Sequence, residues 1–220
     1  MNEKARHGRN KYYQRLDKIV HDGLIQENKK GNIIYLLNQV LTLSPGDTNL
    51  IFAEHPIART KLEDELALYM EGAVEVARYQ EAGIRWWDYC APRLVNTYPT
   101  YFEKLPALLW KINKEKRNSK NYMLHIGETA VDSSQAPCLS LMQFQISQGE
   151  LHLTVYQRSA DSNLGLPSDI YQAWLITKEL NLTLGGITFF IGNAHIYENN
   201  LFNTKRLLLG EKKVKFNLNV

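Results

Sequence analysis

Cys138 is the side chain in this sequence best suited to nucleophilic chemistry. It follows Pro137 at the start of "CLSLMQFQI", whose apolar residues predict a strand that would hold the cysteine rigidly at a cavity. Arg158 comes one residue after the next predicted strand, and an antiparallel pairing around the "SQG" turn would bring it near Cys138. A nearby cation lowers a thiol pKa from its usual value of about 8.5 and raises the thiolate fraction. A single cysteine is more often a small core residue than a nucleophile, so both interpretations stay open here.

A polar segment, "QRSADSNLGLPSDI" at residues 157–170, follows that second strand. We predict a loop here, leading into a helix near residues 169–181. The segment is crowded with groups that hold anions and bases, among them Arg158, Asp161 and Asp169. Asp169 stands two residues after Pro167, at the threshold of an apolar run, and its role is the main question that the segment raises.

Three motifs in this order resemble the signature region of a known family. "APC", "QRSADSNLGLP" and "GNAHIY" are similar to segments of thymidylate synthases and of their relatives, the pyrimidine-nucleotide hydroxymethylases. Upstream, "ELALYMEG" resembles the family's glutamate-bearing helix, and "IRWWDY" resembles its tryptophan–aspartate segment. The resemblance covers roughly residues 59–200. Because the central motif is long and ordered, the chain is identified as a member of this family.

The resemblance implies an α+β fold and a chemical role for several residues. The expected fold is one thymidylate-synthase-like domain, a mixed β-sheet flanked by helices, in a homodimer that pairs sheet to sheet. Cys138 would add to C6 of a pyrimidine and make C5 nucleophilic toward a one-carbon unit from 5,10-methylenetetrahydrofolate. Glu65 would run the proton and water network. The nucleotide-binding residues would be Gln157, Arg158, Ser159, Asp169, His195 and Tyr197. The cofactor-binding residues would be Asp161, Trp87, Leu164 and Gly165.

Simpler explanations exist for several of these residues. Trp87 could be a core residue, Asp161 a loop cap and His195 a buried histidine with satisfied hydrogen bonds. The planar fork of arginine suits phosphate oxygens. A carboxylate such as that of Asp161 can accept two N–H bonds from a pterin ring.

Asp169 departs from the thymidylate synthase pattern, in which an asparagine reads the uracil edge. An asparagine side chain offers a donor and an acceptor, whereas a carboxylate only accepts unless it carries a proton. Cytosine presents an amino donor at C4 and an acceptor at N3, which a protonated or proton-sharing aspartate can match. The same substitution marks the viral deoxycytidylate hydroxymethylases of this family. The alternative is that Asp169 caps the following helix, and both roles could hold at once.

Two further departures favour hydration of the transferred carbon. Leu139 replaces the histidine that follows the nucleophile in the synthases, and Gln135 replaces an apolar leucine that shields the methylene intermediate. We therefore predict C5 hydroxymethylation of dCMP or CMP through a Cys138–C6 adduct. The alternatives are C5 methylation of dCMP or dUMP with folate as hydride donor, and a non-catalytic pyrimidine-nucleotide-binding relative.

Phosphate recognition departs from the family as well. The partner-subunit arginine pair is matched only weakly, by Arg117 and Lys120, which are the expected cations that one subunit lends to the other. The phosphate-loop arginine is missing around "IQENKKGN". The chain ends at "VKFNLNV", without the longer segment that closes over folate in the synthases, and we expect a wetter site for this reason.

Helices and strands must position these residues. Apolar spacing predicts helices over residues 11–27, 59–82 and 100–115, the last disturbed by Pro106 at its start. "NIIYLLNQVLTL" could be a strand or a buried helix, and "SPGDT" breaks the chain after it. The predicted strands are "YMLHIGE", "CLSLMQFQI", "SQGELHLTVYQ", "GGITFFIGNAHIY" and "KVKFNLN". One domain would span residues 1–220, with residues 1–10 as a flexible basic N-terminus.

Composition excludes several classes of protein. The 220 residues are 44% hydrophobic and carry a net charge of +3, too small for a typical nucleic-acid-binding face. No apolar run reaches membrane-spanning length and no signal peptide is recognisable, so we expect a cytoplasmic protein, in host cytoplasm if it is viral. Two cysteines make no disulfide framework, and the six histidines show no metal-ligand spacing, so no metal is expected.

Overall fold

A six-stranded mixed sheet organises the molecule. The computed structural model describes residues 10–128 and 136–218. The strand order is β1-β2-β6-β5-β4-β3, in which only β5 and β6 run parallel and the other neighbours are antiparallel. The strands are β1 (Leu24–Gln26), β2 (Ile33–Leu43), β3 (Met123–His125), β4 (Leu139–Ser147), β5 (Glu150–Asp161) and β6 (Thr183–Tyr197).

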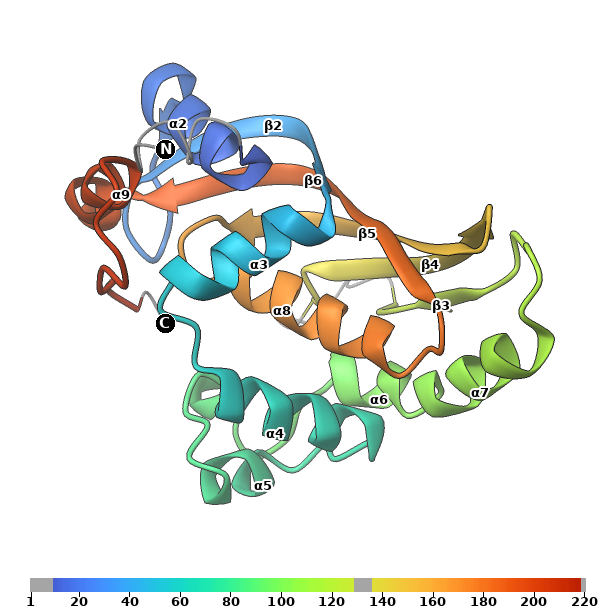
Figure 1. Ribbon diagram of the computed structural model, residues 1–220. Coiled ribbons are helices and arrows are strands. Elements are labelled where there is room, and N and C mark those ends of the chain that lie inside the picture. The colour runs from blue at the N-terminus through green and yellow to red at the C-terminus, as the bar shows by residue number, and fades with distance from the viewer. Residues whose placement is uncertain (1–9, 129–135, 219–220) are drawn as a thin grey trace.

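Helices cover one face of this sheet. Figure 1 shows α3 (Pro45–Glu54) and α8 (Gly165–Lys178) side by side across that face. The helices α4 (Arg59–Met70), α5 (Val76–Glu81), α6 (Tyr98–Phe102) and α7 (Leu105–Glu115) lie beyond α8. At the other end are α2 (Lys11–Asp22) and α9 (Leu201–Leu208). Two short 3₁₀ helices, η1 (Asp88–Cys90) and η2 (Glu198–Asn200), complete the described elements.

Strand β5 shows how the sequence builds the two faces. Leu151, Leu153 and Val155 are at most 2% exposed and pack under the helices, whereas the side chains between them point to the other face. An apolar row crosses that other face, because Val40 pairs with Phe190, Phe190 with Tyr156, and Tyr156 with Leu141. We call this the open face of the sheet. Its exposed large residues include Tyr156 at 45% and Phe190 at 42%.

The N-terminal helix is shorter than predicted. It ends at Asp22, Gly23 is extended, and Leu24 begins β1 with its side chain 63% exposed. Leu24 continues the apolar spacing of the predicted helix, but it pairs with Tyr35 of β2 instead. Residues 1–9 of the predicted flexible N-terminus lie outside the described residues. Asn10, the last of that stretch, is 3% exposed and caps α2 by accepting a hydrogen bond from the Tyr12 N–H.

The "SPGDT" segment starts a helix that the sequence interpretation missed. Ser44 and Asp47 form a reciprocal capping box, and Pro45 occupies the first helical turn of α3. This signature was available in the sequence. The preceding segment, whose type was left open, is strand β2.

Two predicted helices are each divided. Residues 59–82 form α4 and α5, because the chain turns at Gly72, whose φ of 73° favours glycine. Residues 100–115 fall into α6 and α7, with Pro106 in the first turn of α7, where proline is tolerated.

The segment 157–170 is mostly regular structure, contrary to the predicted loop. Residues up to Asp161 belong to β5, α8 starts at Gly165, and only residues 162–164 form the turn between them. Near the C-terminus α9 was missed, and the described part of "KVKFNLN" forms no strand. Phe216 instead stacks on His55, with ring centroids 5.4 Å apart. None of the helices in the described part of the chain is long and apolar enough to cross a membrane.

Candidate active site

Cys138 and Arg158 are neighbours, as the strand pairing predicts. The cysteine directly precedes β4, Leu139 pairs with Gln157 of β5, and an irregularity between Leu139 and Leu141 shifts the register beside it. The Arg158 N–H donates to the Cys138 carbonyl at 2.8 Å. Its guanidinium donates to the carbonyls of Pro137 at 3.1 Å and Ala136 at 2.8 Å. Arg158 therefore braces the cysteine-bearing turn, and its side chain remains exposed.

The pKa of the Cys138 thiol is raised, which corrects the predicted direction. Burial is the largest cause and disfavours the thiolate, and the nearby charge of Asp169 adds to it. Arg158 and Lys30 lower the pKa as expected of cations, but burial outweighs them. The Cys138 N–H donates to the Tyr98 hydroxyl at 3.1 Å.

Asp169 is not a helix cap. It lies in the second turn of α8, whose N-cap residue, Leu164, makes no side-chain cap. The capping alternative is therefore wrong. Asp169 Oδ2 instead accepts a hydrogen bond from Gln157 Nε2 at 2.6 Å. Burial raises the pKa of Asp169 to about 7, with the charges of Glu65 and Asp161 adding to the rise and the Gln157 bond opposing it. The carboxyl therefore keeps its proton to a higher pH than a solvent-exposed aspartate does.

Glu65 lies at the centre of a hydrogen-bonded cluster and is 4% exposed. The indole N–H groups of Trp86 and Trp87 each donate to its Oε1 at 2.6 Å, and Gln172 Nε2 donates to Oε2 at 2.8 Å. Burial raises the pKa of Glu65, and the hydrogen bonds from Trp86, Tyr69, Trp87 and Gln172 oppose that rise. The cluster holds the carboxylate in one orientation.

Two members of this cluster were missed from the sequence. Trp86 stands next to Trp87, and Gln172 follows Asp169 at the three-residue spacing of one helix face. Trp87 also packs against Tyr69 and Tyr98, as a core residue would. Its hydrogen bond to Glu65 makes it part of the site as well.

Asp161 ends β5 and holds the turn before α8. Its Oδ1 accepts the Asn163 N–H at 2.9 Å, which agrees with the loop-cap interpretation. Burial raises its pKa to about 6, and backbone hydrogen bonds from Asn163 and Leu164 oppose the rise. An ionised carboxylate has about four acceptor sites, so these bonds leave room for ring N–H donors. Leu164 and Gly165 adjoin it at the start of α8.

Two neighbouring strands carry three further predicted site residues. Ser159 lies on β5, and His195 and Tyr197 lie on β6. Ser159 pairs with Asn193, and Asp161 pairs with His195. The His195 ring is 5.5 Å from that of Tyr197, and its Nδ1 lies 3.1 Å from Asn193 Oδ1. Burial lowers the pKa of His195, which favours the neutral imidazole, and a hydrogen bond with Asn193 opposes this shift. This hydrogen bond fits both explanations of His195, as a buried histidine with satisfied hydrogen bonds and as a nucleotide-binding residue.

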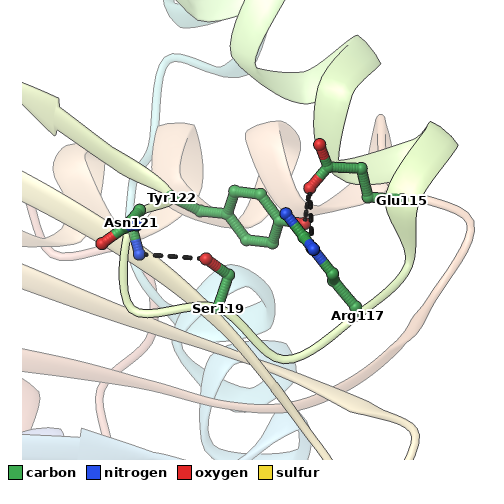
Figure 2. Close-up of polar contacts among 5 residues, drawn as sticks. All are labelled: Glu115, Arg117, Ser119, Asn121 and Tyr122. Carbon is green, nitrogen blue, oxygen red and sulfur yellow. Dashed lines mark hydrogen bonds and ion pairs between the residues drawn. The ribbon is translucent and has the colours of Figure 1, made fainter.

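The expected phosphate cations lie apart from this site within one chain. Figure 2 shows Arg117 beside Glu115, with 3.1 Å between Arg117 Nε and Glu115 Oε2, and the Tyr122 hydroxyl donates to the same oxygen at 2.6 Å. The loop 117–121 lines a wide surface hollow. Within the described part of the chain, no hydrogen bond or ion pair joins Arg117 or Lys120 to Cys138 or Arg158. Gln135, predicted to favour hydration, lies outside the described residues.

Comparisons with known proteins agree on one family. The family described as "Thymidylate synthase" matches residues 10–220. A thymidylate synthase of Staphylococcus haemolyticus is 32% identical over 124 residues, which cover 54% of this chain and 37% of that protein. A thymidylate synthase of Mycoplasma pneumoniae is 43% identical over 81 residues, covering 35% of this chain and 28% of that protein. The chain thus spans only about a third of the length of the curated relatives that it matches.

Proposed function

Because the chain belongs to the thymidylate synthase family, we propose that it transfers a one-carbon unit to C5 of a pyrimidine nucleotide. The observation that carries the proposal is the convergence of Cys138, Glu65 and the Gln157–Asp169 pair from strands and helices far apart in the sequence. Charge effects link these groups, since Asp169 influences the thiol and Glu65 influences Asp169. A protein that only binds nucleotides has no need of the nucleophile.

Each residue has a defined task in this reaction. The Cys138 thiolate adds to C6 of the base, and Arg158 offsets part of the burial that disfavours the thiolate. Arg158 and Ser159 hold the phosphate, while His195 and Tyr197 reach the sugar. Glu65 moves protons at the base through its fixed carboxylate. Thymidylate synthases use 5,10-methylenetetrahydrofolate, which supplies the one-carbon unit. Asp161, Leu164, Gly165 and Trp87 are the residues that would hold it.

The comparisons support methylation of dUMP more than hydroxymethylation. Both named relatives are thymidylate synthases, whose product is the methylated nucleotide. Methylation is therefore the leading product on family grounds.

The environment of Asp169 supports a cytosine base. It therefore favours the second candidate, a cytidylate hydroxymethylase. A carboxyl with a pKa of about 7 can donate its proton to N3 while its other oxygen accepts from the amino group. Gln157 Nε2 donates to Oδ2, which disfavours a proton on that oxygen and favours one on Oδ1. A uracil would set its O4 against an acceptor, a mismatch that costs about 1–3 kcal/mol in a buried site.

Mass spectrometry of the products separates these candidates. The protein is incubated with methylenetetrahydrofolate and CMP, dCMP or dUMP in turn. A gain of one CH2 unit, with dihydrofolate formed, identifies methylation. A gain of CH2O, with tetrahydrofolate formed, identifies hydroxymethylation. No modified nucleotide and no tritium release from C5 would leave only a binding protein.

A homodimer through the open face is the accompanying proposal on assembly. The row of Val40, Phe190, Tyr156 and Leu141 offers a continuous apolar stripe across four strands. Obligate interfaces bury surfaces of this kind. Arg117 or Lys120 of one subunit would then complete the phosphate site of the other. A fully active monomer at micromolar concentration would rule this out.

A further inference from the structure

Gln172 connects two helices at the centre of the site. Its Nε2 donates to Glu65 Oε2 at 2.8 Å and to the Leu62 carbonyl at 3.2 Å, so a residue of α8 holds a carboxylate of α4. Asp169 lies one helical turn earlier on α8. The same helix therefore carries the residue that would read the base and the residue that fixes Glu65.

A small, partly enclosed cavity lies between Asp169 and Gln172. Its polar lining consists of Gln157, Asp169 and Gln172, and the remaining lining residues are apolar. The cavity measures about 20 Å³, and a buried site needs about 10–15 Å³ for one water molecule. Gln157 is 0% exposed, and none of the described residues donates a hydrogen bond to its Oε1. A buried amide oxygen of this kind is costly without a donor.

We propose that Gln172 is a positioning residue that links Glu65 to Asp169, by holding Glu65 Oε2 and by forming, with Gln157, a site for one water molecule beside Asp169. This rests on the proposed function, in which both carboxyl groups act on one base. The water donates to Gln157 Oε1, and the Gln172 amide keeps Glu65 turned toward the two indoles.

The link between Glu65 and Asp169 predicts the direction in which each pKa shifts when Gln172 is replaced. The titratable groups that face Glu65 are Tyr69, Tyr79 and Asp169, and those that face Asp169 also include Asp161, Cys138 and Tyr98. The Gln172 bond lowers the pKa of Glu65, so its loss raises that pKa. A more neutral Glu65 then repels Asp169 less, and the pKa of Asp169 falls. A residue that only tied two helices together would produce neither shift.

The test is Gln172→Met, which keeps the side-chain length and removes the donor. Gln80→Met is the matched control, because Gln80 Nε2 donates to the exposed Asp88 carboxylate at 2.9 Å and not to Glu65. The indole N–H signals of Trp86 and Trp87 report Glu65, and a carbon-labelled carboxyl reports Asp169, both followed by NMR against pH in the full chain.

In Gln172→Met the proton affinity of Glu65 is expected to rise about threefold to tenfold and that of Asp169 to fall, with Gln80→Met unchanged. Unchanged midpoints in folded Gln172→Met would overturn the link. If that variant does not fold, Gln172→Ser replaces it, because its hydroxyl is too short to reach Glu65 and the same upward shift is expected.

These titrations need no turnover, so they stay informative if the proposed reaction is not found. In an active enzyme, Gln172→Met should lower kcat about tenfold and leave the nucleotide KM unchanged, since Arg158 is untouched. An experimental structure of the wild type should place an ordered water within hydrogen-bonding distance of Gln157 Oε1. A dry cavity there would overturn the water site.

Discussion

The two faces of the sheet differ in how many of their side chains find partners within a single chain. On the helix-covered face, Gln157, Asp169 and Glu65 are connected to neighbours by hydrogen bonds of 2.6–2.8 Å. On the open face, Tyr156 and Phe190 remain 45% and 42% exposed. Strand β5 serves both faces, because Gln157 and Arg158 are adjacent and point to opposite sides. In the proposed function, base recognition would thus be built within one chain, whereas phosphate binding would depend on what covers the open face.

The largest effect is expected from removing the nucleophile. Cys138→Ala should abolish tritium release from C5, with a loss of at least about 1000-fold, because no other group forms the covalent bond to C6. Nucleotide binding should persist through Arg158. Release at the wild-type rate would place the chemistry elsewhere.

Asp169→Asn tests the covered face alone. The amide restores a donor and an acceptor, so the ratio of kcat/KM for cytosine over uracil nucleotides should fall roughly 5- to 150-fold, equivalent to about 1–3 kcal/mol. Binding of the phosphate should change little. An unaltered ratio in an active variant would remove the main support for a cytosine substrate.

Phe190→Asp tests the open face alone. A charge at the centre of the apolar row should weaken dimerisation by about 30-fold, as loss of an interface hot spot does. Sedimentation measures the change, and Trp110→Asp is the control, since Trp110 is 65% exposed on α7. Activity should fall with dimer content while the base preference stays constant. Dissociation without any loss of activity would separate the site from the assembly.

The last expected effect concerns the stability of the fold against pH. The pKa of Asp169 is about 7 in the folded protein, above the usual value near 4 of an unfolded chain. Between these two values the folded state holds a proton that the unfolded state releases. The contribution of Asp169 to the free energy of unfolding is therefore fully present below about pH 4 and is lost as the pH rises to about 7. Asp169→Asn removes this decline, and its Tm relative to wild type should rise by roughly 10 °C between pH 4 and pH 8. A constant Tm difference would contradict the raised pKa.

The sequence by itself determined the family and the strands β3, β4, β5 and β6, and it supplied the site residues, whose roles stay predictions. Ordered motifs around Cys138 and Arg158 indicated both the chemistry and the antiparallel pairing, because alternating apolar residues and a short turn specify strand partners locally. Glu65 and Trp87 were assigned through motifs of the same kind. The length of helix 11–27 and the extent of the loop 157–170 were wrong, since cap and strand pairing override apolar spacing at element ends.

Only the tertiary structure decided the electrostatics and the partners of each group. Burial reversed the predicted pKa direction of Cys138 and placed that of Asp169 near 7, and burial depends on residues distant in the sequence. The position of Asp169 in the second turn of α8 removed the capping explanation. Gln172 became visible as a partner of Glu65 because α4 and α8 pack together, a contact between residues 107 positions apart that local sequence pattern does not encode.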